Sequence, residues 1–155
     1  MAVSKTVPAD RVREAIQNGI TLLGENYIQE AREKIEALRE FPVAWHFIGH
    51  LQSNKAKYAV RLFDLIHSVD SLKLVKELDK QARKVNKVQP ILIQVNIALE
   101  GTKSGVAPNE TLELIETAAQ YTHVSIKGLM TMPPFFNSPE KVRPYFAALR
   151  ELSRK

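Results

Sequence analysis

The fold of this chain is decided by its most apolar stretch, Pro90-Ile91-Leu92-Ile93-Gln94-Val95-Asn96-Ile97-Ala98-Leu99. Only Gln94 and Asn96 interrupt it, and residues 91–95 are nearly continuous in apolar character. A strand of a parallel sheet has this character when both of its faces are buried. The stretch is too short to cross a bilayer, which takes about 20 apolar residues. It therefore predicts a buried parallel strand and no membrane segment.

Short apolar runs and amphipathic segments alternate on both sides of this strand. Strands are predicted to begin near Ala2, Thr21, Ala44, Leu65, Pro90 and Val124. Helices are predicted over Pro8–Asn18, Ile28–Arg39, Ser71–Asn86, Asn109–Tyr121 and Ser138–Lys155. We expect Ser71 to cap its helix, and Pro144 either to kink the last helix or to delay its start to near Arg143. The alternation implies parallel strands with right-handed crossovers, and hence an α/β fold.

Two α/β architectures are compatible with this alternation, an open doubly wound sheet and a (β/α)8 TIM barrel. Doubly wound folds that bind dinucleotides carry a glycine-rich turn after the first strand. Here the residues Ser4-Lys5-Thr6-Val7-Pro8 occupy that place, which favours the barrel. A complete barrel usually takes about 250 residues, whereas these 155 residues hold about six strand–helix units. We therefore expect one domain over residues 1–155, an incomplete barrel.

The composition is that of a soluble globular protein, with 45% hydrophobic and 25% charged residues. The absence of cysteine excludes disulfides, thiolate metal ligands and cysteine nucleophiles. The net charge is +5, but the basic residues are interspersed with acidic ones, as in residues 76–80, so no nucleic-acid interface is expected. The positive net charge would attract small phosphorylated anions. No apolar segment follows Met1-Ala2-Val3-Ser4-Lys5, so no secretory signal is visible and a cytoplasmic location is expected.

Lys5 is the first candidate for chemistry, because it follows the first predicted strand. In parallel α/β folds the carboxyl ends of the strands face the ligand site. An amine held there, partly removed from water, has a lowered pKa and attacks carbonyl carbons more readily. A Schiff base with an aldehyde cofactor such as pyridoxal phosphate is one consequence. The plainer alternative is a solvent-exposed lysine without a role.

Asn26 and two histidines follow the second and third predicted strands. Asn26 is suited either to bind a ring hydroxyl or a phosphate, or to cap the helix that follows it. His46 and His50 are four residues apart, but Gly49 lies between them and no third ligand is evident, so no metal site is predicted. We expect His46 to be a hydrogen-bonded core residue.

The fifth and sixth predicted strands are followed by two further candidate segments. Lys103-Ser104 resembles part of a phosphate loop, but Thr102 stands where that motif requires glycine, which leaves only a basic loop near an anionic ligand. Met130, in the segment 127–134, either packs against a flat cofactor ring or fills the barrel end.

Five segments together resemble the pyridoxal phosphate homeostasis protein family. In order along the chain they are Ala2–Thr6, Gly24–Glu30, His46–Lys55, Lys103–Gly105 and Gly128–Met130. The resemblance covers essentially the whole chain. It implies an alanine-racemase-like barrel that holds pyridoxal 5′-phosphate (PLP) as a reversible Schiff base on Lys5. It also implies that Asn26, Ile48 and Met130 lie at the cofactor site.

The same resemblance implies a non-catalytic role in intracellular PLP homeostasis, with PLP-dependent apoenzymes as possible partners. A catalyst needs an acid or base on each face of the cofactor, whereas a carrier needs reversible bonding and open access. No motif here supplies the second base, although an amino-acid racemase using Lys5 as its base is the alternative. The family continues into a serine- and glycine-rich phosphate loop and has a helix before its first strand. We therefore expect the chain to be truncated at both ends.

Overall fold

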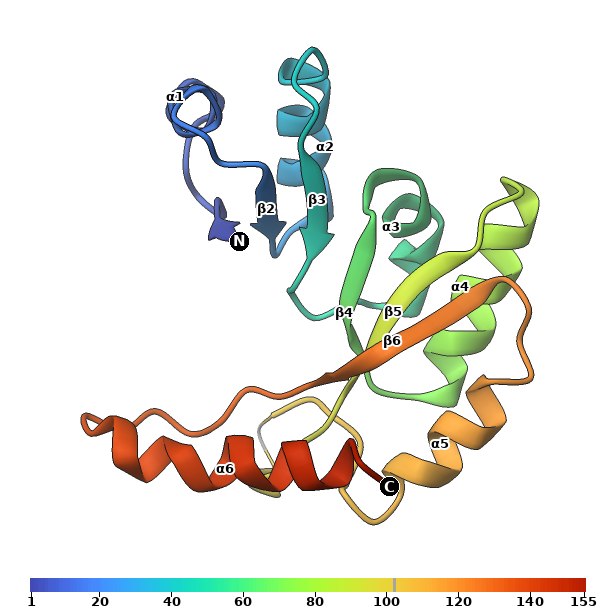
Figure 1. Ribbon diagram of the computed structural model, residues 1–155. Coiled ribbons are helices and arrows are strands. Elements are labelled where there is room, and N and C mark those ends of the chain that lie inside the picture. Colours follow the sequence, from blue (N-terminus) through green and yellow to red (C-terminus); the bar gives the residue numbers. More distant parts are fainter. Residues whose placement is uncertain (102) are drawn as a thin grey trace.

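Six strands form one sheet in the computed structural model, which describes residues 1–101 and 103–155 (Figure 1). The strands are β1 (Ala2–Val3), β2 (Leu22–Glu25), β3 (Ala44–Phe47), β4 (Leu65–Val69), β5 (Gln89–Gln94) and β6 (Val124–Met130). The helices are α1 (Ala9–Gln17), α2 (Ile28–Ala37), α3 (Ala56–Leu62), α4 (Leu72–Lys84), α5 (Thr111–Ala118) and α6 (Pro139–Leu152). A short 3-10 helix, η1 (Ser53–Lys55), precedes α3.

The strands lie side by side in their order along the chain, from β1 to β6, and every pairing is parallel. In a doubly wound sheet the strand order reverses at a switch point. The unbroken order found here is that of a TIM barrel. Figure 1 shows the strand direction turning progressively from β2 to β6. These observations confirm the incomplete α/β barrel and exclude the doubly wound alternative.

The hydrophobic core lies between the helices and the face of the sheet that they cover. Its largest fully buried side chains include Phe47, Phe63, Leu23, Leu38, Ile66, Leu74, Leu78, Ile91 and Ile93. Phe47 of β3 and Phe63, directly after α3, pack with their ring centroids 5.1 Å apart. On β5, Ile91 and Ile93 are fully buried, whereas Leu92 between them is only partly buried. The expectation of burial on both faces therefore holds for one face alone, because the other lines an open hollow.

The predicted helices are found within about three residues of their expected ends. Ser71 caps α4 as expected, since its Oγ accepts a hydrogen bond from the backbone N–H of Leu74 at 3.4 Å. Helix α6 begins at Pro139 and contains Pro144, so it does not start near Arg143. The periodicity gave no bounds for α3, because seven residues span only two turns. No helix among the described residues has the length and apolar character needed to cross a membrane.

Candidate functional site

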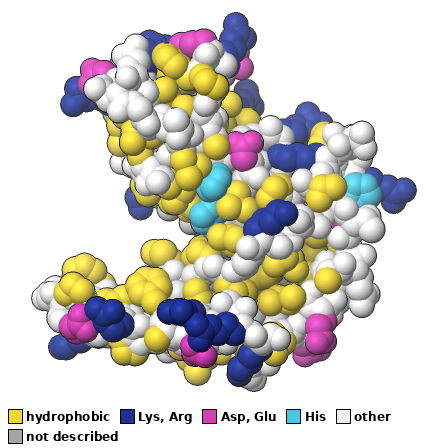
Figure 2. Space-filling view, in the orientation of Figure 1, with side chains coloured by type: hydrophobic (Ala, Val, Ile, Leu, Met, Phe, Trp, Pro, Cys, Tyr) yellow, Lys and Arg dark blue, Asp and Glu magenta, His cyan; other side chains and the backbone are white. Residues whose placement is uncertain are grey.

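The side chains of the sheet alternate between the helix-covered face and the opposite face, which we call the concave face. Ser4 and Glu25 point toward the helices, where Ser4 Oγ donates a hydrogen bond to Glu25 Oε1 at 2.7 Å. Val3 and Gly24 are register partners one residue earlier, so they belong to the concave face. A Cβ atom at Gly24 would lie 3.2 Å from Cδ1 of Ile48. The concave face is hollowed in Figure 2 and is lined there by hydrophobic and histidine side chains.

Lys5 follows Ser4 directly and lies two residues after the end of β1. Lys5 is exposed and lies in a turn that the backbone N–H of Val7 closes by donating to the carbonyl oxygen of Ser4 at 3.1 Å. Thr6, the next residue, has a left-handed backbone with φ of 62°. The predicted lysine thus stands at the carboxyl edge of the sheet, where the strands end.

Asn26 follows β2 directly at the same edge. Its Oδ1 atom is buried and has no hydrogen-bond partner within the described part of the chain. Helix α2 is capped at Tyr27 without a side-chain hydrogen bond, so the expectation that Asn26 caps this helix is wrong. Gly49 packs directly on Asn26, because a Cβ atom at Gly49 would lie 2.2 Å from the Asn26 carbonyl oxygen. The backbone that carries this Oδ1 acceptor is therefore closely packed at the carboxyl edge.

Ile48, directly after β3, and Met130, the last residue of β6, also lie at this edge, and both are partly buried. The backbone N–H of Ile48 donates to the carbonyl oxygen of Glu25 at 2.9 Å. Met130 is the last residue of β6 and the register partner of Gln94. Lys5 follows one edge strand of the sheet, β1, and Met130 ends the other, β6, whereas Asn26 and Ile48 follow the neighbouring strands β2 and β3. Alternation assigns Ile48 and Met130 to the concave face.

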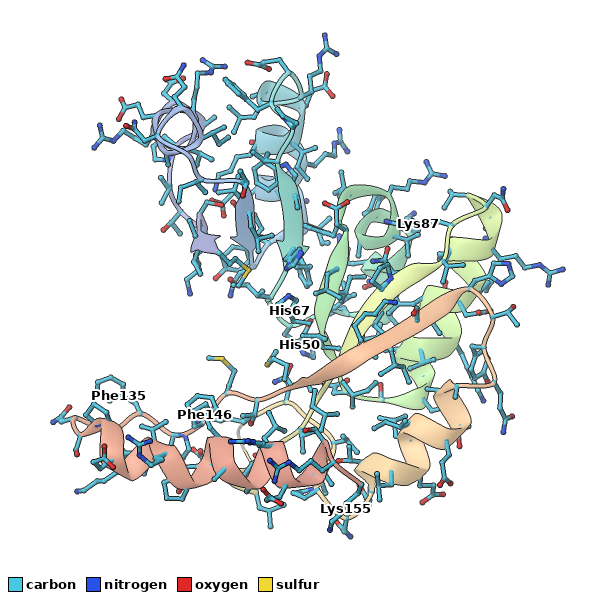
Figure 3. The ribbon with its side chains drawn as sticks, viewed as in Figure 1. His50, His67, Lys87, Phe135, Phe146 and Lys155 are labelled. Atoms are coloured by element: carbon cyan, nitrogen blue, oxygen red, sulfur yellow. The ribbon has the colours of Figure 1, made fainter. Side chains whose placement is uncertain are left out.

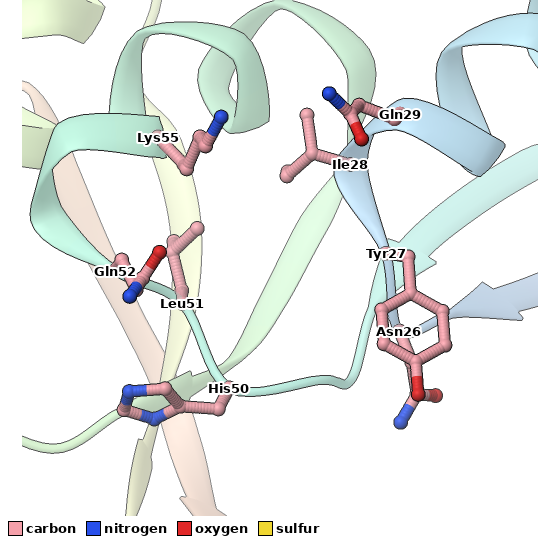
Figure 4. Close-up of a pocket in the computed structure, with 8 residues that line it drawn as sticks. All are labelled: Asn26, Tyr27, Ile28, Gln29, His50, Leu51, Gln52 and Lys55. Atoms are coloured by element: carbon pink, nitrogen blue, oxygen red, sulfur yellow. The ribbon is translucent and has the colours of Figure 1, made fainter.

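A pocket of about 220 Å³ opens between the loop after β2 and the loop after β3 (Figure 4). Its lining residues are Asn26, Tyr27, Ile28, Gln29, His50, Leu51, Gln52 and Lys55. Of the four predicted site residues, only Asn26 lines this pocket. Two basic residues of this lining, His50 and Lys55, come from the segment between β3 and α3.

The loops after β3 and β5 meet at the carboxyl edge. His50 Nδ1 lies 3.1 Å from Ser104 Oγ, 54 residues further along the chain. In the same loop, Lys103 Nζ lies 2.9 Å from Glu100 Oε1 and donates to the carbonyl oxygen of Met132 at 3.4 Å. The predicted basic loop is therefore next to the other loops of this edge, while Thr102 lies outside the described residues.

His46 and His67 form a pair on the concave face, with His67 Nε2 3.0 Å from His46 Nδ1. His46 is hydrogen-bonded as expected, but it is only partly buried and faces the hollow rather than the core. Burial lowers the pKa of both rings, and for His67 burial together with His46 lowers the pKa to about 4. Figure 3 shows His50 and His67 beside the hollow. The motif-based reasoning missed His67, because its only signal is its place on the strand next to His46.

A buried ion-pair cluster behind the site was also missed. Lys34 Nζ lies 2.8 Å from Glu25 Oε1 and 2.6 Å from Glu30 Oε1, and it also donates to the carbonyl oxygen of Ser4. The sequence signal was the spacing of Glu30 and Lys34, one helical turn apart. Among residues 1–101 and 103–155, no three His, Asp or Glu side chains gather in a way that could hold a metal ion.

The fold and this edge define the class of the protein. The family described as alanine racemase, N-terminal domain, matches residues 1–155. The fold is also that of an alanine racemase of Clostridium difficile 630, with a TM-score of 0.77 and 12% identity, covering 99% of this chain and 42% of that one. At that identity the likeness concerns the fold alone.

Within this class, the chain belongs to the pyridoxal phosphate homeostasis protein family, which confirms the resemblance of its motifs. It is 47% identical over 152 residues to the family member of Aquifex aeolicus, covering 98% of this chain and 67% of that protein. It is 40% identical over 136 residues to the family member of Escherichia coli K12, in a match that covers 86% of this chain and 58% of that protein. The structure of PipY of Synechococcus elongatus, solved with PLP bound, matches with a TM-score of 0.92 and 37% identity. The match covers 99% of this chain and 72% of that one. The chain thus spans about two thirds of the length of these relatives.

Proposed function

We propose that this chain binds PLP reversibly through Lys5 and acts in intracellular PLP homeostasis. The observation that carries the proposal is the position of Lys5, an exposed amine that follows β1 at the carboxyl edge of a racemase-like barrel. Two findings on relatives support it, namely the names of the homeostasis proteins and the PLP bound by PipY.

The residues of the carboxyl edge suit the chemical groups of PLP. Asn26 Oδ1, buried and unpartnered among the described residues, would accept a hydrogen bond from the ring hydroxyl. Ile48 and Met130, both partly buried, would contact the flat ring through apolar atoms. The net charge of +5 favours a phosphorylated anion. These three residues and Lys5 are the proposed binding residues.

When bound, PLP supplies an aldehyde carbon with which a free amine condenses reversibly, with loss of one water molecule. Lys5 supplies the amine, and its exposure allows water to reach the bond and reverse it. Reversible bonding with open access is what a carrier needs in order to pass its cargo on. We therefore propose PLP-dependent apoenzymes as recipients, and the cytoplasm as the place of action.

An amino-acid racemase with Lys5 as its base is the alternative function. Such an enzyme needs a second acid or base on the opposite face of the cofactor. On β1 and β2 the concave-face positions next to Lys5 are Val3 and Gly24, and neither residue titrates. The titrating side chains of that face on the next two strands, His46 of β3 and His67 of β4, are hydrogen-bonded to each other. This composition favours a non-catalytic carrier.

The test is to add PLP, reduce with borohydride, and map the adduct by peptide mass spectrometry. We expect the label on Lys5, its loss in Lys5→Ala, and wild-type labelling in Lys57→Ala, which removes an exposed lysine of α3. Label scattered over surface lysines would refute the proposal. If the same sample racemises alanine or serine, the protein is an enzyme and the carrier hypothesis is wrong.

A further inference from the structure

The turn that carries Lys5 is held by α2 as well as by the sheet. The last backbone hydrogen bond along β1 runs from the N–H of Ser4 to the carbonyl oxygen of Gly24, at 3.0 Å. Beyond it, the backbone N–H of Thr6 donates to Glu30 Oε1 of α2 at 2.5 Å. The two residues on either side of Lys5 are therefore fixed by different elements.

The backbone conformation of Thr6 is strained, so this turn needs a stabilising contact from another element. Its φ of 62° lies in the left-handed region, which is unfavourable for a β-branched residue. Its Oγ1 donates to the carbonyl oxygen of Lys5 at 2.6 Å, which is a contact within the turn itself. The hydrogen bond from Thr6 N–H to Glu30 is the contact that ties this strained residue to another element.

Lys34 joins the two ends of the turn through one ammonium group. Its Nζ contacts Glu30 Oε1 at 2.6 Å and Glu25 Oε1 at 2.8 Å, and it donates to the carbonyl oxygen of Ser4. The Lys34 side chain is 6% exposed and that of Glu25 is 0% exposed, so water cannot replace a lost partner. The hydrogen bond from Lys34 lowers the pKa of Glu30, which keeps its carboxylate charged at neutral pH.

We propose that Glu30 and Lys34 are positioning residues for Lys5, which fix the backbone of Ser4 and Thr6 and so set the direction in which the Lys5 amine is presented. The expected effect on the rate of PLP addition to Lys5 rests on the proposed function. The expected effect on the reactivity of the Lys5 amine does not, because that reactivity can be measured without the cofactor.

Glu30→Ala is the principal variant, because the Glu30 side chain is 27% exposed and its removal leaves Lys34 paired with Glu25. Glu36→Ala is the matched control, since Glu36 also lies on α2 and forms an exposed ion pair with Arg39 at 2.9 Å. We expect Glu30→Ala to slow the borohydride-trapped addition of PLP to Lys5 by about 10-fold, as small misplacements of a reactive group do. We expect Glu36→Ala to leave that rate unchanged.

Two rescue variants separate positioning from a general loss of structure. Glu30→Gln keeps an acceptor for the N–H of Thr6 and should react at close to the wild-type rate. Thr6→Gly removes the strain, because glycine adopts a positive φ at no steric cost, so adding it to Glu30→Ala should restore most of the rate. The double variant also keeps the test valid if Glu30→Ala alone does not fold. A double variant that folds and stays as slow as Glu30→Ala overturns the inference.

The cofactor-free measurement is the reactivity of Lys5 toward acetic anhydride as a function of pH, followed by mass spectrometry with Lys57 as the internal reference. We expect Glu30→Ala to change the Lys5 reactivity several-fold and Lys57 not at all. Equal Lys5 reactivity in Glu30→Ala and Glu36→Ala overturns the inference. If Lys5 reactivity shifts as expected while PLP does not label Lys5 in the wild type, the positioning role stands and the proposed function fails.

Discussion

His67 of β4 and His46 of β3 share a hydrogen bond across neighbouring strands, with 3.0 Å between His67 Nε2 and His46 Nδ1. One ring must donate and the other accept, which requires at least one of them to be neutral. Their ring centroids are 5.0 Å apart, so two positive charges there would repel each other. The pair is therefore a pH-sensitive element in the wall of the hollow.

The first prediction concerns the titration of this pair. The pKa of His67 is lowered to about 4 by burial and by His46, and burial lowers that of His46 as well. Because the folded state binds the proton more weakly than the unfolded state, the neutral pair contributes its full share to the free energy of unfolding above pH 6.5, the unfolded pKa. That contribution is lost as the pH falls from 6.5 toward 4. Proton NMR titration of the imidazole C2 protons and urea unfolding at several pH values measure this.

His67→Asn is the variant for this prediction, because it removes one titrating ring and keeps a polar side chain. It should weaken the pH dependence of the unfolding free energy between pH 6.5 and 4. A His67 ring that titrates near 6.5 in the folded wild type contradicts the prediction.

The second prediction concerns the contact between Gly49 and Asn26. A Cβ atom at Gly49 would lie 2.2 Å from the Asn26 carbonyl oxygen and 2.7 Å from its Cα, and neither atom belongs to a flexible side chain. Gly49→Ala should therefore lower the unfolding free energy by about 1–3 kcal/mol, as overpacking does, and displace Asn26. Gly101→Ala is the control, since a Cβ atom there meets nothing within 4 Å. Equal urea midpoints for the two variants would refute the steric argument.

The third prediction concerns the buried ion pair of Lys34 and Glu25. Lys34→Met should lower the unfolding free energy by about 3–5 kcal/mol, because it leaves a buried carboxylate without its counter-charge. The double variant Lys34→Met with Glu25→Leu should recover part of that loss, since no buried charge remains at Glu25. Denaturant unfolding of the single and double variants measures the difference. Additive losses in the double variant would contradict this account.

The fourth prediction compares two phenylalanines in opposite environments. Phe47 is fully buried against Phe63, so Phe47→Ala should cost about 3–5 kcal/mol of unfolding free energy. Phe135, labelled in Figure 3, is 91% exposed, and Phe135→Ala should change the unfolding free energy by less than about 0.5 kcal/mol. Thermal or urea unfolding of the two variants provides the check, and similar losses would show that the core lies elsewhere.

The fold was predictable because apolar periodicity reports burial directly. The strand starts at Ala2, Ala44, Leu65 and Val124 agree with the structure to the residue, and Leu65 and Val124 each follow a change from polar to apolar residues. Helix α3 received no bounds, because a seven-residue helix offers too little periodicity. The open concave face beside Leu92 was not predicted, because the sequence shows that a residue is apolar but does not show whether another part of the molecule covers it.

The candidate site was predictable only where a residue follows a strand in sequence. Lys5, Asn26 and Met130 were proposed as site residues in this way, whereas Ile48 was proposed from the family resemblance alone, and the roles of all four are those that the resemblance implies. The contacts that shape the site depend on three-dimensional neighbours, which spacing does not report. The bond between His50 and Ser104, which joins loops 54 residues apart, is of this kind.

The strand that precedes Lys5 is the shortest among the described residues, since β1 has two residues and pairs there with β2 alone. A strand with so few ladder hydrogen bonds opens at a far lower free energy than the longer strands of a sheet. Fraying of residues 1–7 would withdraw the amine while β2 to β6 stay folded. Retention of a molecule attached at Lys5 is thus thermodynamically linked to order in residues 2–7, and amide hydrogens there should exchange more slowly when that molecule is present.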